Sequence, residues 1–109
     1  MDEYLQVLTT ASSPDEAARV SDELLTQRLA ACIQVVGPIR SRYWWEGSLE
    51  DAEEWLLICK TRAERFDEVA EAIRTAHSYD VPEVTAFGVE AGSADYLAWL
   101  GREVPARPG

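Results

Sequence analysis

Basic residues and long apolar runs are scarce in this 109-residue sequence. Ten Lys and Arg stand against twenty Asp and Glu, which gives a formal charge of -10. A surface this acidic repels phosphate groups, so we expect neither a nucleic-acid partner nor binding to anionic membranes. The longest uncharged apolar run, residues 29–36, is far too short to cross a bilayer. An N-terminus that carries acids where a secretory signal has basic residues predicts a cytoplasmic location.

Cysteine, histidine and glycine are equally sparse, and this limits the chemistry that side chains can perform. Cys32 and Cys59 each lie in an apolar, strand-like run without a CxxC motif. We therefore expect two buried, reduced thiols and no disulfide. The chain has a single histidine, His77, and lacks a glycine-rich phosphate loop and a nucleophile elbow. These absences predict a protein that is not an enzyme.

Hydrophobic periodicity predicts one domain over residues 1–103, followed by a tail over 104–109. A capping box, in which Ser13 and Glu16 satisfy each other's backbone donors, should begin the first helix, with Pro14 at its first position. The expected strands are residues 4–10, 31–45, 53–61 and 84–90, and the expected helices are 14 to about 27–29, 66–76 and 96–100. The order β-α-β-β-α-β-α is typical of an α+β, ferredoxin-like split βαβ fold with one additional C-terminal helix.

Aromatic side chains at residues 43–45 suggest that one chain is not sufficient. Because strand side chains alternate between faces, Trp44 should face one way and Tyr43 and Trp45 the other. A long second strand would also project past its own core and offer unpaired edges to another copy of the chain. The alternative is that the Gly37-Pro38 pair breaks this strand into two ordinary pieces. Trp55 is expected at an interface or in the core.

Five segments carry a family resemblance: residues 29–32 (LAAC), 41–47 (SRYWWEG), 60–61 (KT), 77–83 (HSYDVPE) and 95–100 (DYLAWL). Together they resemble the CutA family of divalent-cation tolerance proteins. The resemblance implies a ferredoxin-like subunit in a stable homotrimer similar to the PII-type signalling proteins, with hairpins pairing across subunits. The implied trimer interface contains Tyr43, Trp44, Trp45 and Trp55.

The same resemblance implies an association with copper and other divalent cations. In some members a Cys at the end of the first strand and a His-His pair are assigned to the metal site. Here Thr9 or Thr10 and Ala76 occupy the corresponding positions, so His77 is the one metal ligand carried over. A single imidazole without a thiolate is a poor site for copper. We therefore expect weak binding of copper or zinc, falling as His77 protonates, and no tightly bound cofactor.

A shared cleft is expected to hold a small ligand or a divalent cation, and its predicted members are Lys60, His77, Tyr79, Glu83 and Trp99. The simpler alternatives are a helix-end histidine and an ion pair between Lys60 and Glu83. Acids at residues 50–54 are expected to form a solvated hairpin face or to recruit hard divalent ions loosely. The preferred function is a homotrimeric binding or signalling protein that responds to metal ions. The alternative is a non-catalytic scaffold or a PII-like regulator of a partner protein.

Overall fold

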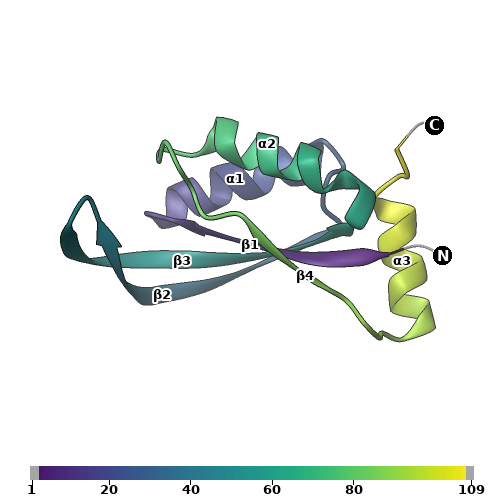
Figure 1. Cartoon of the computed structure of the whole chain (residues 1–109). Helices are drawn as coiled ribbons and strands as arrows, with labels where there is room; N and C mark the ends of the chain where they lie inside the picture. The colour runs from purple at the N-terminus through teal and green to yellow at the C-terminus, as the bar shows by residue number, and fades with distance from the viewer. Residues whose placement is uncertain (1–2, 108–109) are drawn as a thin grey trace.

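A four-stranded antiparallel sheet carries two helices on one face and a third helix at one end (Figure 1). The structure is a computed structural model that describes residues 3–107; the ends of the predicted domain and tail, residues 1–2 and 108–109, lie outside this range. The elements are β1 (Tyr4–Ala11), α1 (Pro14–Thr26), β2 (Cys32–Trp45), β3 (Ser48–Arg62), a 3-10 turn (Ala63–Arg65), α2 (Phe66–Ala76), β4 (Thr85–Gly88) and α3 (Ala94–Glu103).

The sheet has the strand order β2-β3-β1-β4, and every neighbouring pair is antiparallel. Strands β1 and β2 therefore run parallel with β3 between them, and α1 makes the crossover that joins them. This split βαβ unit confirms the predicted α+β, ferredoxin-like class.

The main core lies between the sheet and helices α1 and α2. Along α1 the buried positions recur at helical spacing, with Val20 and Leu24 facing the sheet, and Val69 and Ile73 do the same along α2. Leu57 and Cys59 meet them from β3 and are fully buried. The periodicity of the sequence therefore placed both helices correctly, and α2 has the predicted bounds.

A second, smaller core forms where α3 packs against the beginning of β1. Tyr4, Leu100 and Val104 are buried there. Arg62 binds the end of α3, because its Nε donates to the Val104 carbonyl at 2.5 Å and its Nη2 to the Gly101 carbonyl at 2.6 Å. Val104, which the sequence placed at the start of the tail, is thus part of the folded core.

The β2–β3 hairpin extends well past the rest of the sheet. Strand β1 ends at Ala11, opposite Trp55, whereas the pairing of β2 with β3 continues to Trp45 and Ser48. The molecule is consequently elongated, with extents of 44 × 25 × 23 Å. An irregularity lies between Val36 and Ile39, yet the strand continues through it, so the Gly37-Pro38 pair bends β2 without ending it.

The sheet face opposite α1 and α2 is apolar and only partly covered. Because Leu57 and Cys59 face the helices, Leu56 and Ile58 point the other way. The register brings Val36 and Phe87 to this same face, where they are 48% and 63% exposed. Helix α3 covers one end of this open face, and among residues 3–107 no other element lies over its middle (Figure 1).

Candidate functional site

A cavity of about 720 Å³ lies between the β2–β3 hairpin and the loop that joins α2 to β4. We call it the hairpin pocket. Aromatic, acidic and small apolar side chains form its wall, and its lining residues are Thr10, Ser41, Arg42, Tyr43, Trp45, Glu54, Tyr79, Asp80, Val81, Pro82 and Glu83. The site therefore joins a projecting hairpin to a loop that α2 separates from it in the sequence.

The register of the hairpin decides which aromatic residues reach this pocket. Tyr43 and Trp45 share one face of the ribbon and line the pocket. Trp44 pairs with Leu49 on the opposite face, where their exposed fractions are 73% and 52%. Both faces of the hairpin are thus aromatic or apolar, as the alternation of residues 43–45 predicts. Trp55, by contrast, is half-buried against the main core of its own chain.

A buried tyrosine–carboxylate pair forms the back of the pocket. The Tyr79 hydroxyl donates to Glu54 Oε2 over 3.0 Å, and Glu54 is only 5% exposed. Burial and, next, the hydrogen bond to Glu54 together raise the pKa of Tyr79 to about 12. Tyr79 therefore stays protonated at neutral pH and acts as a donor to the carboxylate.

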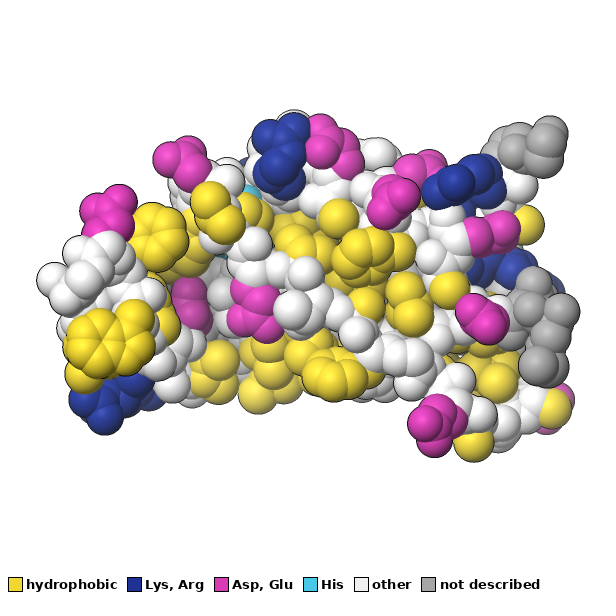
Figure 2. All heavy atoms as spheres, in the orientation of Figure 1, with side chains coloured by type: hydrophobic (Ala, Val, Ile, Leu, Met, Phe, Trp, Pro, Cys, Tyr) yellow, Lys and Arg dark blue, Asp and Glu magenta, His cyan; other side chains and the backbone are white. Residues whose placement is uncertain are grey.

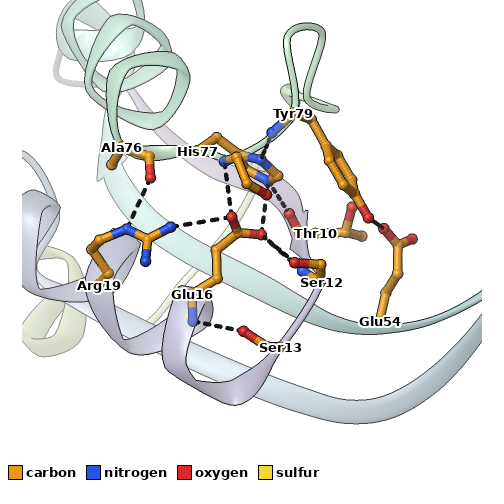
Figure 3. A network of polar contacts seen from close by, with 10 residues as sticks. Thr10, Ser12, Ser13, Glu16, Arg19, Glu54, Ala76, His77 and Tyr79 are labelled. Carbon is orange, nitrogen blue, oxygen red and sulfur yellow. Dashed lines mark hydrogen bonds and ion pairs between the residues drawn. The ribbon is translucent and has the colours of Figure 1, made fainter.

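His77 lies behind Tyr79 with no exposed side-chain surface. Its Nε2 is 2.5 Å from the Thr10 carbonyl, and its Nδ1 accepts the Tyr79 backbone N–H over 3.0 Å (Figure 3). Since the carbonyl accepts and the amide donates, the ring carries its proton on Nε2. His77 thus joins the end of β1 to the start of the α2–β4 loop, and both of its nitrogens are engaged in that structural role.

Glu16 is the anchor of the same network, although the sequence assigned it only to a helix cap. Its Oε1 accepts the Ser12 backbone N–H and its Oε2 accepts the Ser78 backbone N–H, each over 2.8 Å, and Arg19 donates to Oε2 over 3.2 Å (Figure 3). Burial by itself would raise the pKa of Glu16, but hydrogen bonds from Ser78 and Ser12 outweigh it and lower the pKa to about 2.

The predicted capping box is therefore half correct. Ser13 Oγ accepts the Glu16 backbone N–H over 3.1 Å, as expected. The Glu16 carboxylate, however, bonds Ser12 and Ser78 instead of returning to Ser13. The carboxylate consequently ties the first turn of α1 to the loop that carries Tyr79.

The structure does not gather the five residues of the predicted cleft. Tyr79 and Glu83 line the hairpin pocket and His77 lies behind it. Lys60 lies six residues along β3 from Glu54, about 20 Å away at the rise of a strand. Trp99 lies in α3 and packs against the small core. In the described residues no ion pair links Lys60 with Glu83. Tyr43 and Trp45, assigned from the sequence to an interface, are the pocket residues that this expectation missed.

The residues present do not form a built site for a divalent metal. Both nitrogens of His77 are already hydrogen-bonded, so ligation would require breaking one of these contacts. Within residues 3–107 no three His, Cys, Asp or Glu side chains come together as a potential metal site. Cys32 and Cys59 are both free, as expected, but Cys32 is only half-buried. The two thiols also lie on opposite faces of the sheet.

A family comparison decides where this chain belongs. The model of the CutA1 divalent ion tolerance protein family matches residues 5–103. The chain belongs to the CutA1 family. The divalent-cation tolerance protein CutA of Archaeoglobus fulgidus is 41% identical over 98 residues, which cover 90% of this chain and 95% of the relative. Its counterpart from Thermus thermophilus is 36% identical over 86% of this chain and 91% of the relative.

Solved CutA1 structures have the same fold. The crystal structure of CutA1 from Oryza sativa has a TM-score of 0.93 at 35% identity and covers 96% of both chains. The periplasmic divalent cation tolerance protein CutA from Archaeoglobus fulgidus has a TM-score of 0.89 at 39% identity, covering 96% of this chain and all of the other. Within residues 3–107 every helix is too short or too polar to span a lipid bilayer.

Proposed function

We propose that this CutA1-family protein is a non-catalytic homotrimer that binds a small ligand in the hairpin pocket and takes part in the response to divalent metal ions. The observation that supports the trimer is the uncovered apolar surface. Trp44, Leu49 and Phe87 are all more than half exposed, and they lie on the hairpin and on the open face of the sheet. Apolar patches of this kind on a small domain mark protein–protein contacts.

The projecting β2–β3 hairpin favours a closed ring of subunits over a dimer. Beyond Ala11 no other strand among residues 3–107 pairs with either edge of the hairpin, so its backbone edges are available to another copy. A head-to-tail contact between hairpins closes into a ring when the rotation permits it. The PII-like arrangement that we expect from the family resemblance has this form.

The environment of the cysteines and histidine supports a binding role over catalysis. Burial raises the pKa of Cys59 to about 12, and a thiol in that state is a poor nucleophile. Among the residues that the structure describes, His77 bonds two backbone groups and no cysteine or hydroxyl nucleophile. The hairpin pocket, in turn, favours a ligand-binding protein over a purely structural scaffold, because a scaffold does not need a pocket lined by aromatic and acidic side chains.

Any divalent metal should bind weakly. Hard cations prefer several converging oxygen ligands, and copper prefers thiolates or several imidazoles. The described residues supply neither arrangement, so a link to copper or zinc tolerance would be indirect or would use surface carboxylates. A cytoplasmic location, and the lack of nucleic-acid and membrane partners, remain our predictions from the sequence.

Light scattering tests the assembly directly. We expect a mass of about three times 12.2 kDa at micromolar concentration. Trp44→Ala should weaken the trimer, since it removes a large exposed ring from the hairpin. Leu25→Ala, on the surface of α1, is the matched control and should leave the mass unchanged. A monomeric wild-type protein would refute the proposed assembly.

A further inference from the structure

We propose that the hairpin pocket recognises an organic cation, an alkylammonium or quaternary ammonium group held by the Glu54 carboxylate against aromatic rings. This inference rests on the proposed function, because it takes the pocket to be the ligand site. It adds the chemical class of the ligand. The pocket combines a carboxylate oxygen that has no partner among residues 3–107, an excess of negative charge and several aromatic side chains.

One oxygen of the Glu54 carboxylate is free to meet a ligand. Its Oε2 accepts the Tyr79 hydroxyl, but within residues 3–107 no group donates to Oε1. In this range the fully enclosed side-chain atoms without a hydrogen-bond partner are Thr9 Oγ1 and Ser21 Oγ. Glu54 Oε1 is not among them, so it is accessible from the pocket that Glu54 lines. A cation in the pocket would therefore meet this carboxylate directly, in a partly enclosed site where the attraction between opposite charges is stronger than in open water.

The charge of the lining also favours a cation. Asp80 and Glu83 add two carboxylates to Glu54, whereas Arg42 is the one basic residue in the wall. Arg42 is already paired, because its Nε lies 3.5 Å from Oδ2 of Asp51 across the hairpin. The pocket therefore carries excess negative charge, which opposes anions and attracts cations.

Aromatic rings make an organic cation a better fit than a metal ion. Tyr43, Trp45 and Tyr79 line the pocket, and the faces of such rings attract ammonium groups. In Figure 2 hydrophobic side chains gather at the hairpin end of the molecule with acidic side chains among them. A metal ion would instead need several ligands converging on one point, and residues 3–107 contain no such group.

The cation has two conceivable sources with the same chemistry. It is either a free small molecule or the Lys or Arg head group of a second copy of the chain. Either would place its positive charge beside Glu54 Oε1 and lie against the aromatic wall. The experiment therefore measures binding and assembly on the same variants.

Choline and its neutral isostere 3,3-dimethyl-1-butanol provide the binding test. Titrations of the assembled protein, followed by calorimetry and tryptophan fluorescence, should show choline binding about tenfold more tightly than the alcohol. Glu54→Gln should weaken choline binding about tenfold, and Trp45→Leu, on the surface hairpin, should also weaken it. Glu53→Gln is the matched control, because this exposed neighbour lies outside the pocket lining.

The outcomes separate this inference from the proposed function. If the trimer forms but choline and the alcohol bind equally, or butyrate or Mn²⁺ binds more tightly than choline, the cation assignment is overturned and the trimeric binding protein stands. If choline does not bind and Glu54→Gln alone dissociates the trimer, the cation comes from a second copy. If choline does not bind and both Glu variants assemble normally, the inference fails.

Discussion

Replacing Glu16 with glutamine should reveal how strongly the buried network holds the pocket loop. The side chain is 2% exposed and accepts hydrogen bonds from Ser12, Ser78 and Arg19. Lowering its pKa from 4.5 to about 2 corresponds to about 3 kcal/mol of stability at neutral pH, at about 1.4 kcal/mol for each pH unit. We expect Glu16→Gln to lose a stability of this size at pH 7.

The pH dependence gives the prediction its sharpest form. A carboxyl whose pKa is lower in the folded state stabilises the protein above the pKa of the unfolded chain, and this stability is lost as the pH falls through the folded value. The difference between wild type and Glu16→Gln should therefore be complete above about pH 5 and should shrink between pH 4.5 and about 2. Denaturant unfolding at fixed protein concentration measures it.

Asp15→Asn is the matched control. Asp15 lies in the same first turn of α1 and is exposed, so it shares the helix-dipole effect but not the network. Its substitution should cost about 0.5 kcal/mol or less. If Glu16→Gln and wild type differ by a constant amount from pH 7 to pH 2, the reasoning about the charged network is refuted.

Three further predictions concern the core, the thiols and the metal. Gly37→Ala should destabilise the protein by about 1–3 kcal/mol, because a Cβ there would overlap the indole of Trp55. Gly88→Ala is the control, since a Cβ at Gly88 meets nothing within 4 Å. Equal unfolding midpoints for the two variants would contradict this prediction. Cys59 should resist alkylation until the protein unfolds, because burial raises the pKa of its thiol to about 12. Half-buried Cys32 should react first, and mass spectrometry of the native protein checks this order. Calorimetry with Cu(II) and Zn(II) should show weak binding, and His77→Ala should leave it unchanged because both ring nitrogens are already hydrogen-bonded. Nanomolar affinity that is lost in this variant would show that His77 ligates metal.

Local signals in the sequence were sufficient for most of the fold. Helical spacing located α2 at Phe66–Ala76, and the Ser13-Pro14 pair located the beginning of α1. The first third of β3 was missed because residues 48–52 are mostly polar and have no strand pattern of their own. They are extended because β2 pairs with them along the hairpin.

The site was harder to predict because it depends on contacts between distant segments. The capping motif showed that Glu16 begins a helix, but nothing local indicates that its carboxylate also binds Ser78, 62 residues further on. Lys60 and Trp99 were grouped with His77 in one predicted cleft, yet strand length and the position of α3 keep them apart. The alternation of side chains along a strand predicts that Tyr43 and Trp45 share one face of the hairpin. It does not indicate which face lies against the loop after α2.

The arginine contacts with the end of α3 and the residues after it also determine how the chain responds to mechanical force. Arg62 and Arg65 donate to the carbonyls of Gly101, Val104 and Pro105, so a pull on the segment after α3 is transmitted to the end of β3. Strand β3 is an inner strand, paired with β2 on one side and β1 on the other. It cannot peel away as an edge strand does, and its two ladders would bear the load together. An unfoldase that pulls on the segment after α3 would therefore load β3, an inner strand with two paired neighbours, first.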